Sequence, residues 1–461
     1  MIDIAHIRSA YFIGAGGIGM SALIRWFMAR GVRVAGYDRT PSPLTGHLID
    51  EGAAIHFEDD VHLIPDGFSD PQTTLVVYTP AVPSDHTELN HFRRSGFEVM
   101  KRAEVLGLIT SASRAICVAG THGKTTVSSM TAHLLKQSHV DCNAFLGGIL
   151  KGYASNLMLS DHSDLTVVEA DEYDRSFHRL HPTTAIITSA DPDHLDIYGT
   201  PAAYREAFEV FTSLIRPGGT LIIKKDAPIT PRLQPDARCY TYSATDTSAD
   251  FHAENVRIGD GEAVFDCVLS DGTRITDIHL GVPVRINVEN GVAAIAAAWL
   301  HGVRPDEIRS AMASFPGAER RFDIRLRNDR VVLIDDYAHH PEELTRSILS
   351  VKELYAGRRI TGIFQPHLYS RTRDFADEFA RSLSLLDELI LVDIYPARED
   401  PIPGVTSEMI LEHVTIADKR CCTKAELPDI IAAGTFDVVL ILGAGDIDRL
   451  VEPIRQILAQ R

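Results

Sequence analysis

The sequence has few cysteines, few basic residues and no long hydrophobic run, and each shortage narrows what the protein can be. Its six cysteines among 461 residues have no C-x-x-C spacing, which favours reduced, structural thiols. Lys and Arg total 45 against 63 Asp and Glu, a net charge of −18, so no basic surface for nucleic acid is expected. The apolar runs are short and bounded by Gly, Pro or charged residues, so no segment is expected to span a membrane.

The N-terminus and the length indicate a multidomain protein of the cytoplasm. The stretch MIDIAHIRSAYFIGAGG has no basic leader followed by an apolar stretch and a cleavage site, so we expect a cytoplasmic location. A chain of 461 residues is long enough for two or three domains, each with its own core. An acidic enzyme with anionic substrates must concentrate positive charge or metal ions locally.

A glycine-rich turn near the N-terminus fits the pattern G-x-G-x-x-G. The segment AYFIGAG predicts a strand, SALIRWFMARG a helix and VRVAGYD a second strand. Gly14, Gly16, Gly17 and Gly19 would let the backbone approach a diphosphate at the helix N-terminus. Asp38 ends the second strand about 20 residues on, where an acid commonly binds a ribose hydroxyl. We predict a nucleotide-diphosphate site, with a glycine turn used only for packing and a surface carboxylate as the alternatives.

A second strand–loop–helix pattern, RAICVAGTHGKTTVSSMTAHLLK, contains an incomplete phosphate-binding loop. The usual loop is G-x-x-x-x-G-K-[ST], and Val118 stands where its first glycine belongs. Lys124 is expected to reach the β and γ phosphates, and a threonine hydroxyl at the helix start is expected to bind Mg²⁺. The predicted nucleoside triphosphate site comprises Gly120, Thr121, His122, Gly123, Lys124, Thr125 and Thr126.

Acidic residues follow two strands of the same region, in VVEADEYD and SADPDHLDIYG. In open parallel sheets, ligands bind outside the carboxyl ends of the strands. Glu169 and His194 could therefore complete a Mg²⁺ shell that Thr125 begins, since Mg²⁺ takes few protein oxygens beside phosphates and water. The alternatives are a capping or surface acid for Glu169 and a turn histidine for His194.

Strand and helix patterns alternate through most of the chain, which predicts an α/β fold with parallel sheets. LTVVEAD, TTAIITSA and GTLIIKK extend the central sheet, whereas residues 236–285 predict short strands of an antiparallel appendage. A further α/β unit follows SFPGAERRFDIR, with strands VVLIDDY, RRITGIFQP, ELILVDIYP and DVVLILGAG.

The last region has two clusters of polar residues at expected strand ends, and an arginine pair before them. DDYAHHPEE runs from Asp335 to Glu343, and FQPHLYSRTRD contains His367, Tyr369, Arg371 and Arg373. A capped helix start is the alternative for the first cluster. Arg321 could bind a phosphate bidentately or form an interdomain salt bridge, and the sequence leaves both open.

Taken together these residues resemble the Mur ligases of peptidoglycan synthesis. The resemblance rests on the segments Gly120–Thr126 and Asp193–Asp196 and on Glu169, Asn287, Asn290, Arg321 and Asp336. GAGGIGMSA, MKRAEVLG, FPGAERRFD, DDYAHHP, FQPHLYSRTR and PIPG point within the family to its alanine-adding branch. The similarity runs from about residue 10 to residue 446.

The resemblance implies three domains and an ATP-driven ligation. The implied domains are a Rossmann-like UDP-sugar domain at 1–108, a P-loop ATPase-like domain at 109–323 and a Rossmann-like amino-acid domain at 324–461. The lactyl carboxylate of UDP-N-acetylmuramate would attack the γ-phosphate of ATP, and L-alanine would then attack the resulting acyl phosphate. ATP and Mg²⁺ are the implied cofactors, and a monomer or homodimer is expected.

The resemblance also implies roles for individual residues. Thr125 and Glu169 would hold one Mg²⁺ and His194 a second, while Lys124 would act on the transferred phosphoryl group. Asn287 and Asn290 would contact adenine, and Arg321 and Asp336 would lie near the nucleotide. The amino-acid site would be lined by Tyr337, His339 and Arg371. The diphosphate at Gly14–Gly19 would belong to UDP.

Three positions depart from the family pattern: Ile286 replaces a usual histidine, Leu368 a frequent arginine and Ala338 a frequent glycine. A related alternative is the recycling ligase that adds a whole tripeptide to UDP-N-acetylmuramate. Alternatives of other classes are an NAD-dependent dehydrogenase, based on Gly14–Gly19 and Asp38, and a nucleotide-binding switch without catalysis.

Overall fold

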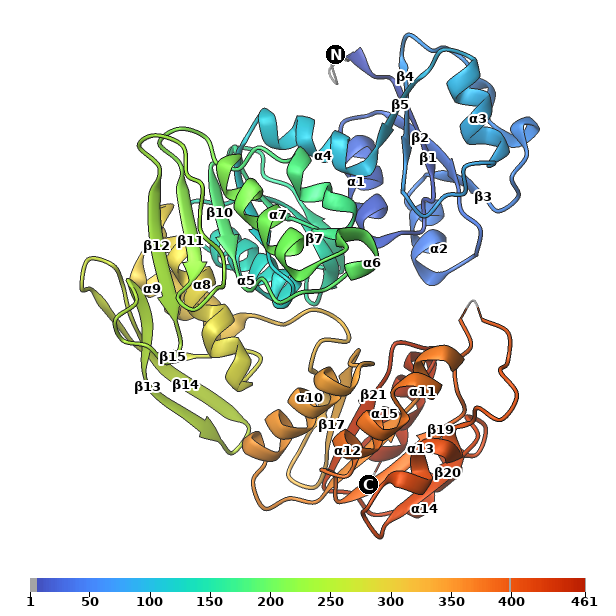
Figure 1. The fold of residues 1–461 in the computed structure, drawn as a ribbon, viewed down its shortest axis with the longest axis vertical. Coiled ribbons are helices and arrows are strands. Elements are labelled where there is room, and N and C mark those ends of the chain that lie inside the picture. The colour runs from blue at the N-terminus through green and yellow to red at the C-terminus, as the bar shows by residue number, and fades with distance from the viewer. Residues whose placement is uncertain (1–5, 398, 461) are drawn as a thin grey trace. The chain divides into compact units, whose positions relative to one another are not determined.

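The computed structural model describes residues 6–397 and 399–460, with Asp196 described by its backbone only. Three sheets follow one another along the chain, coloured blue, green to yellow, and orange to red in Figure 1. The chain divides into two compact units. The first comprises Met1–Glu254, Asp266–Ile278 and Glu289–Pro316, and the second comprises Asn255–Phe265, His279–Val288 and Gly317–Arg461.

The first sheet is parallel and has the strand order β3-β2-β1-β4-β5. Its strands are β1 (Ser9–Ile13), β2 (Arg33–Tyr37), β3 (Ala54–His56), β4 (Thr74–Tyr78) and β5 (Glu98–Lys101). The helical segments are α1 (Ile18–Met28), α2 (Pro43–Asp50), η2 (Val61–Leu63), η3 (Asp66–Phe68), α3 (Thr87–Arg94) and α4 (Arg102–Ser111). Because the strand order reverses at β1, the turn after β1 lies where such sheets bind ligands.

The central sheet has ten strands in the order β15-β14-β13-β12-β11-β10-β6-β9-β7-β8. They are β6 (Arg114–Ala119), β7 (Asn143–Leu150), β8 (Ser155–Met158), β9 (Leu165–Glu169), β10 (Thr184–Ile187), β11 (Thr220–Lys224), β12 (Arg238–Ser243), β13 (Phe251–Gly259), β14 (Glu262–Val268) and β15 (Arg274–His279). The helical segments of this region are α5 (Lys124–Lys136), η4 (Tyr173–Arg179), α6 (Leu195–Tyr198), α7 (Pro201–Ser213), α8 (Arg285–Leu300) and α9 (Pro305–Ser314). Contrary to expectation for residues 236–285, β12 pairs parallel with β11 and extends the parallel part of the sheet.

The third sheet has the order β16-β17-β21-β18-β19-β20, and its neighbours are parallel except for the pair β16 and β17. Its strands are β16 (Asp323–Arg327), β17 (Val332–Asp336), β18 (Ile360–Phe364), β19 (Glu388–Val392), β20 (Lys419–Cys422) and β21 (Val438–Leu442). Its helices are α10 (Pro341–Leu354), α11 (Tyr369–Asp374), α12 (Ala376–Leu383), α13 (Ser407–His413), α14 (Leu427–Ala433) and α15 (Asp448–Ala459). The predicted α/β architecture is confirmed, and the exact domain boundaries stay predictions. No helix in the described part of the chain is long and apolar enough to cross a membrane.

Helix α1 joins the first two sheets into one compact unit. Its Trp26 side chain, 7% exposed, lies with its ring centre 6.5 Å from that of Phe145 on β7. The fully buried amide of Asn156 on β8 donates to the Ile18 carbonyl at 2.5 Å and accepts from the Arg25 guanidinium at 2.8 Å. A buried amide satisfied in this way fixes the first turn of α1 against the central sheet.

The Asn156→Ala substitution should destabilise the first unit by about 1–3 kcal/mol, because it removes the hydrogen bonds that join β8 to Ile18 and Arg25 of α1. Both tryptophans of the chain, Trp26 and Trp299, lie in this unit, so the fluorescence change during urea unfolding measures the effect. Gln456→Ala, on the exposed face of α15, is the control and should leave this transition unchanged. An unchanged transition midpoint in Asn156→Ala would show that the amide does not hold α1 in place.

Candidate active site

The phosphate loop connects β6 to α5 and is shaped by two glycines. Gly120 and Gly123 have φ angles of 147° and 81°, values that side-chain-bearing residues rarely adopt. A Cβ atom on Gly120 would lie 2.0 Å from the hydroxyl oxygen of Thr188, which follows β10. That hydroxyl donates to the His122 carbonyl at 2.5 Å, and the Ser189 hydroxyl accepts from the His122 amide at 2.9 Å. The end of β10 therefore holds the loop in shape.

Thr121 anchors the other side of the loop. Its hydroxyl donates to the Asp191 carbonyl at 2.6 Å and lies 2.9 Å from the hydroxyl of Tyr204 on α7. Burial, followed by the charge of Glu172, raises the pKa of Tyr204, so this phenol stays neutral and can serve as a donor or acceptor.

Lys124, the first residue of α5, is held by the loop and by a buried acid. Its ammonium donates to the Gly120 carbonyl at 2.6 Å and lies 2.8 and 2.7 Å from the two carboxylate oxygens of Glu172. Glu172 is 2% exposed. Burial raises the pKa of the Glu172 carboxyl, and the charge of Lys124 opposes that rise. The sequence indicated an acidic segment here but not this ion pair.

Glu169 ends β9 beside the phosphate loop, since it pairs in register with Val118 of β6. One carboxylate oxygen accepts a hydrogen bond from the Gly147 amide of β7 at 3.2 Å. A Cβ atom on Gly147 would lie 2.3 and 2.4 Å from the two carboxylate oxygens. Gly147 thus holds the Glu169 carboxylate in place and leaves room for it. The sequence did not predict this role, because it depends on the contact between β7 and β9.

His194 lies at the start of α6 in a left-handed conformation, with φ of 50°. Its ring is edge-on to that of Tyr173 at 5.2 Å, and its side chain is 35% exposed. In residues 6–397 and 399–460, apart from the Asp196 side chain, no cluster of three or more His, Cys, Asp or Glu residues could hold a metal by itself. Thr125, Glu169 and His194 stay the predicted ligands of a Mg²⁺ ion, which would take its remaining ligands from phosphates and water.

Asn290 on α8 lies against the phosphate loop, as a Cβ atom on Gly123 would be 2.9 Å from its amide oxygen. Asn287, one turn earlier, is buried and donates its amide to the Val282 carbonyl at 3.1 Å. Ile286 is 53% exposed. The structure thus brings Asn290 to the loop, while Asn287 helps to form the start of the helix.

Asp38 accepts a hydrogen bond from the first glycine loop and holds it in shape. Gly14 has a φ angle of 89°, and its amide donates to the Tyr37 carbonyl at 2.8 Å. The Gly16 amide donates to the Asp38 carboxylate at 2.6 Å. A Cβ atom on Gly16 would lie only 2.9 Å from the same carboxylate oxygen. Gly17 caps α1. Asp38 therefore supports the loop in addition to its predicted role toward a ribose.

Arg102, at the start of α4, lies beside the first turn of α1. A Cβ atom on Gly19 would be 2.8 Å from one guanidinium nitrogen, and another nitrogen lies 3.1 Å from the Asp171 carboxylate. This arrangement puts a cation next to the helix N-terminus that was predicted to bind diphosphate. The sequence motif MKRAEVLG, which contains Arg102, resembles the family but did not predict that Arg102 lies beside the first turn of α1.

In the second unit, Asp336 ends β17 and accepts a hydrogen bond from the Ser347 hydroxyl of α10 at 2.6 Å. Burial raises the pKa of Asp336, against the opposing effects of the Ser347 bond and the Arg321 charge. The guanidinium carbon of Arg321 lies 5.6 Å from the ring centre of Tyr337. The structure therefore brings Arg321, Asp336 and Tyr337 together.

His339 and Arg371 belong to the same group of side chains. The His339 backbone amide donates to the Glu343 carboxylate at 3.0 Å, and the centre of the His339 ring lies 5.2 Å from that of the Tyr337 ring. Burial lowers the pKa of the His339 imidazole. One terminal nitrogen of Arg371 is buried and has no hydrogen-bond partner among the described residues. An unsatisfied buried guanidinium nitrogen fits a carboxylate ligand.

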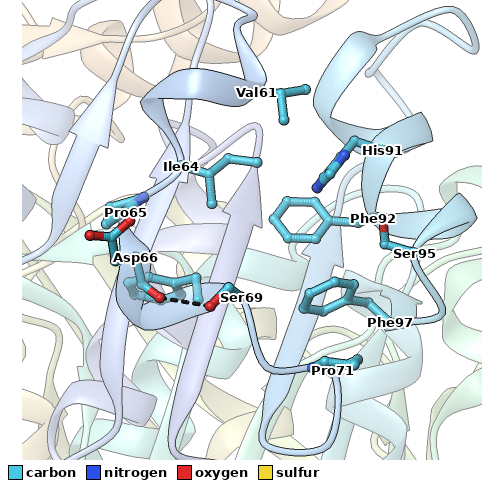
Figure 2. A pocket seen from close by; sticks show the side chains of 11 residues that line it. Val61, Ile64, Pro65, Asp66, Ser69, Pro71, His91, Phe92, Ser95 and Phe97 are labelled. Carbon is cyan, nitrogen blue, oxygen red and sulfur yellow. Dashed lines mark hydrogen bonds between the residues drawn. The ribbon is translucent and has the colours of Figure 1, made fainter.

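Two cavities open on the first unit. One, of about 380 Å³, is lined by residues of η2, η3, α3 and the segments beside them. Figure 2 shows its apolar wall, which includes Ile64, Phe92 and Phe97. The other, of about 440 Å³, is lined by residues that include Tyr78, Arg93, Lys101 and Asp174. No predicted site residue lines the first cavity. The second is lined by Lys101, the residue that precedes Arg102 in the sequence.

Three family profiles match successive parts of the chain. They are the catalytic domain of the Mur ligase family at residues 9–114, the Mur ligase middle domain at 118–298 and the Mur ligase glutamate ligase domain at 320–445. UDP-N-acetylmuramate–L-alanine ligase of Parabacteroides distasonis is 67% identical over 460 residues, which cover 100% of this chain and 99% of that one. The chain belongs to the Mur ligase family.

Solved structures of other Mur ligases have the same fold. UDP-N-acetylmuramate–alanine ligase of Thermotoga maritima is 28% identical, with a TM-score of 0.81 and 98% of each chain covered. Murein peptide ligase of Psychrobacter arcticus is 23% identical, also with 98% of each chain covered, and its TM-score of 0.66 shows a shared fold. The resemblance stated from the sequence motifs is confirmed at the level of the family.

Gly147→Ala should lower the rate of turnover with ATP roughly 100-fold and raise the Mg²⁺ concentration needed for half-maximal activity, because the added methyl group would displace the Glu169 carboxylate. Phosphate release measured over a Mg²⁺ titration gives both quantities. Gly46→Ala is the control, since the added methyl group would have no neighbouring atom within 4 Å and α2 tolerates alanine. Unchanged Mg²⁺ dependence in Gly147→Ala would mean that Glu169 does not bind the metal.

Proposed function

We propose that this chain is the ATP-dependent ligase that joins L-alanine to the lactyl carboxylate of UDP-N-acetylmuramate. The observation that carries the proposal is a phosphate loop folded around Lys124 in a chain 67% identical, over its whole length, to a UDP-N-acetylmuramate–L-alanine ligase. The proposed reaction forms an acyl phosphate and ADP, and the amine of alanine then displaces phosphate. Cytoplasmic location and a monomeric or homodimeric state remain predictions.

The proposed role of the loop is to bind the triphosphate and stabilise its transfer. The loop amides and the Lys124 ammonium would neutralise charge on the transferred phosphoryl group. Mg²⁺, when bound, supplies further neutralisation of phosphate charge, with Thr125, Glu169 and His194 as its proposed protein ligands. Asn290, against Gly123, would border the nucleotide.

The first glycine loop is the proposed site of the UDP diphosphate. Two features support this role: the free start of α1 after Gly17 and the guanidinium of Arg102 beside Gly19. Asp38, which accepts a hydrogen bond from the Gly16 amide, would hold the loop in shape while its neighbours contact the nucleoside.

The second unit supplies the proposed amino-acid site. Arg371 would bind the carboxylate of alanine through its unsatisfied nitrogen, beside His339 and Tyr337. Burial lowers the pKa of His339, so its ring is neutral at physiological pH and can accept a hydrogen bond from the incoming ammonium group. Arg321 and Asp336 stay predicted nucleotide-binding residues.

Two alternative functions account for less of the molecule. A dehydrogenase would use the first glycine loop and Asp38 but would leave Lys124, Glu172 and the second phosphate loop without a role. A ligase for a whole tripeptide would use the same loops, and substrate choice alone distinguishes it.

Phosphate release in the presence of ATP, Mg²⁺ and UDP-N-acetylmuramate should require an added amino acid, in the proposal L-alanine, because an amine must displace phosphate from the acyl phosphate. Glycine, L-serine and the tripeptide are tested in turn, with product mass confirmed by spectrometry. Turnover with the tripeptide alone would assign the recycling reaction instead. No turnover in any mixture would overturn the ligase proposal.

Arg371→Met should raise the KM for L-alanine about 10- to 100-fold while the KM for ATP stays the same, because a charged hydrogen bond to the amino-acid carboxylate is lost. Steady-state kinetics with each substrate varied in turn measures this split. Arg373→Met is the matched control, since Arg373 is exposed and pairs with the exposed Asp374 at 2.8 Å. Equal effects of the two substitutions would remove Arg371 from the amino-acid site.

A further inference from the structure

The ammonium of Lys124 has all three of its N–H donors directed at protein oxygens. They face the Gly120 carbonyl at 2.6 Å, the Thr121 carbonyl at 3.3 Å and the Glu172 carboxylate at 2.7 and 2.8 Å. An ammonium has no further donor to offer. A phosphate that binds this lysine must therefore take the place of one of these oxygens.

Glu172 is the partner that a phosphate would displace. The Gly120 and Thr121 carbonyls belong to the loop itself and remain beside Lys124 whatever binds. The Glu172 carboxylate is an anion, so it occupies the lysine in the same way that a phosphate would. Among the described residues, Lys124 is the one cation that forms an ion pair with Glu172.

Glu172 is also fixed in position, so it cannot follow the lysine. Its carbonyl accepts hydrogen bonds from the Tyr198 hydroxyl at 2.5 Å and from the Arg175 amide at 3.0 Å. The residue is 2% exposed and precedes a turn in which Asp174 and Arg175 have left-handed backbones. Asp171, its acidic neighbour, is paired with Arg102 instead.

We propose that Glu172 is a positioning residue that holds Lys124 against the phosphate loop and is exchanged for the nucleotide phosphates on binding. This inference rests on the proposed function, in which a nucleoside triphosphate occupies the loop. The exchange leaves a buried carboxylate without its cation and next to bound phosphate, which opposes binding. Glu172 therefore weakens the binding of ATP and ADP alike and helps ADP to leave after each turnover.

Glu172→Gln should bind ADP and ATP about 10-fold more tightly or better, because the lysine no longer has a competing anion. Isothermal titration of the full-length protein with each nucleotide measures the dissociation constants, and stopped-flow displacement measures the release rate of ADP. In steady state the KM for ATP and kcat should both fall, the latter because ADP leaves more slowly. A merely structural role would lower the melting temperature and leave these nucleotide parameters unchanged.

Asp174→Asn is the matched control. Asp174 lies two residues from Glu172, is 40% exposed in its side chain and pairs with Lys101 rather than Lys124. Asparagine also tolerates the left-handed backbone at this position. The control removes one negative charge from the same segment and should leave nucleotide affinity within the error of the measurement.

Glu172→Asp provides a second variant if the glutamine variant does not fold. It keeps the charge but withdraws the carboxylate by one methylene group, so nucleotide binding should tighten by less than in Glu172→Gln. Unchanged or weaker binding in both variants, with normal ATP binding by the unaltered protein, would overturn the role of Glu172 and leave the proposed function standing. Absence of ATP binding by the unaltered protein would overturn both.

Discussion

The candidate active site depends on the contact between the phosphate loop and the end of β10. Thr188 reaches the carbonyl of His122 only because Gly120 has no side chain, and Ser189 takes the amide of the same residue. These bonds fix the loop between two neighbouring parallel strands, β6 and β10. Lys124, which begins α5 directly after the loop, and Asn290, which lies against Gly123, are positioned by this arrangement.

A short acidic segment, residues 171–174, forms ion pairs with three cations of the first unit. Within four residues, Asp171 pairs with Arg102, Glu172 with Lys124 and Asp174 with Lys101. In a chain with a net charge of −18, three cations of the first unit are thus each paired with a carboxylate of this segment. The burial of the partner decides how strongly each pair opposes binding, because exposed pairs are screened by solvent. Glu172, the most buried of the three, therefore has the largest expected effect.

The sequence predicts the residues whose role follows from local order, and misses those whose role depends on contacts between distant segments. A glycine loop between a strand and a helix identifies Lys124, and the rule that parallel strands end at one edge places Glu169 beside it. The pairing of Glu172 with Lys124 joins residues 48 positions apart. Gly147 is recognisable only from the space that Glu169 occupies. The parallel pairing of β12 was missed because alternation of polar and apolar residues does not fix strand direction.

The departure at Leu368 falls at a turn whose backbone is held by main-chain hydrogen bonds. This residue precedes α11 with a φ of 72°, a conformation that costs a leucine free energy unless the surroundings enforce it. Its amide donates to the Tyr395 carbonyl at 3.0 Å, and its carbonyl accepts from the Thr372 amide at 3.1 Å. The backbone of Leu368 thus sets the direction of α11, which carries Arg371. Because that turn is fixed by main-chain bonds, the side chain at 368 can change while the guanidinium of Arg371 keeps its buried, unsatisfied nitrogen.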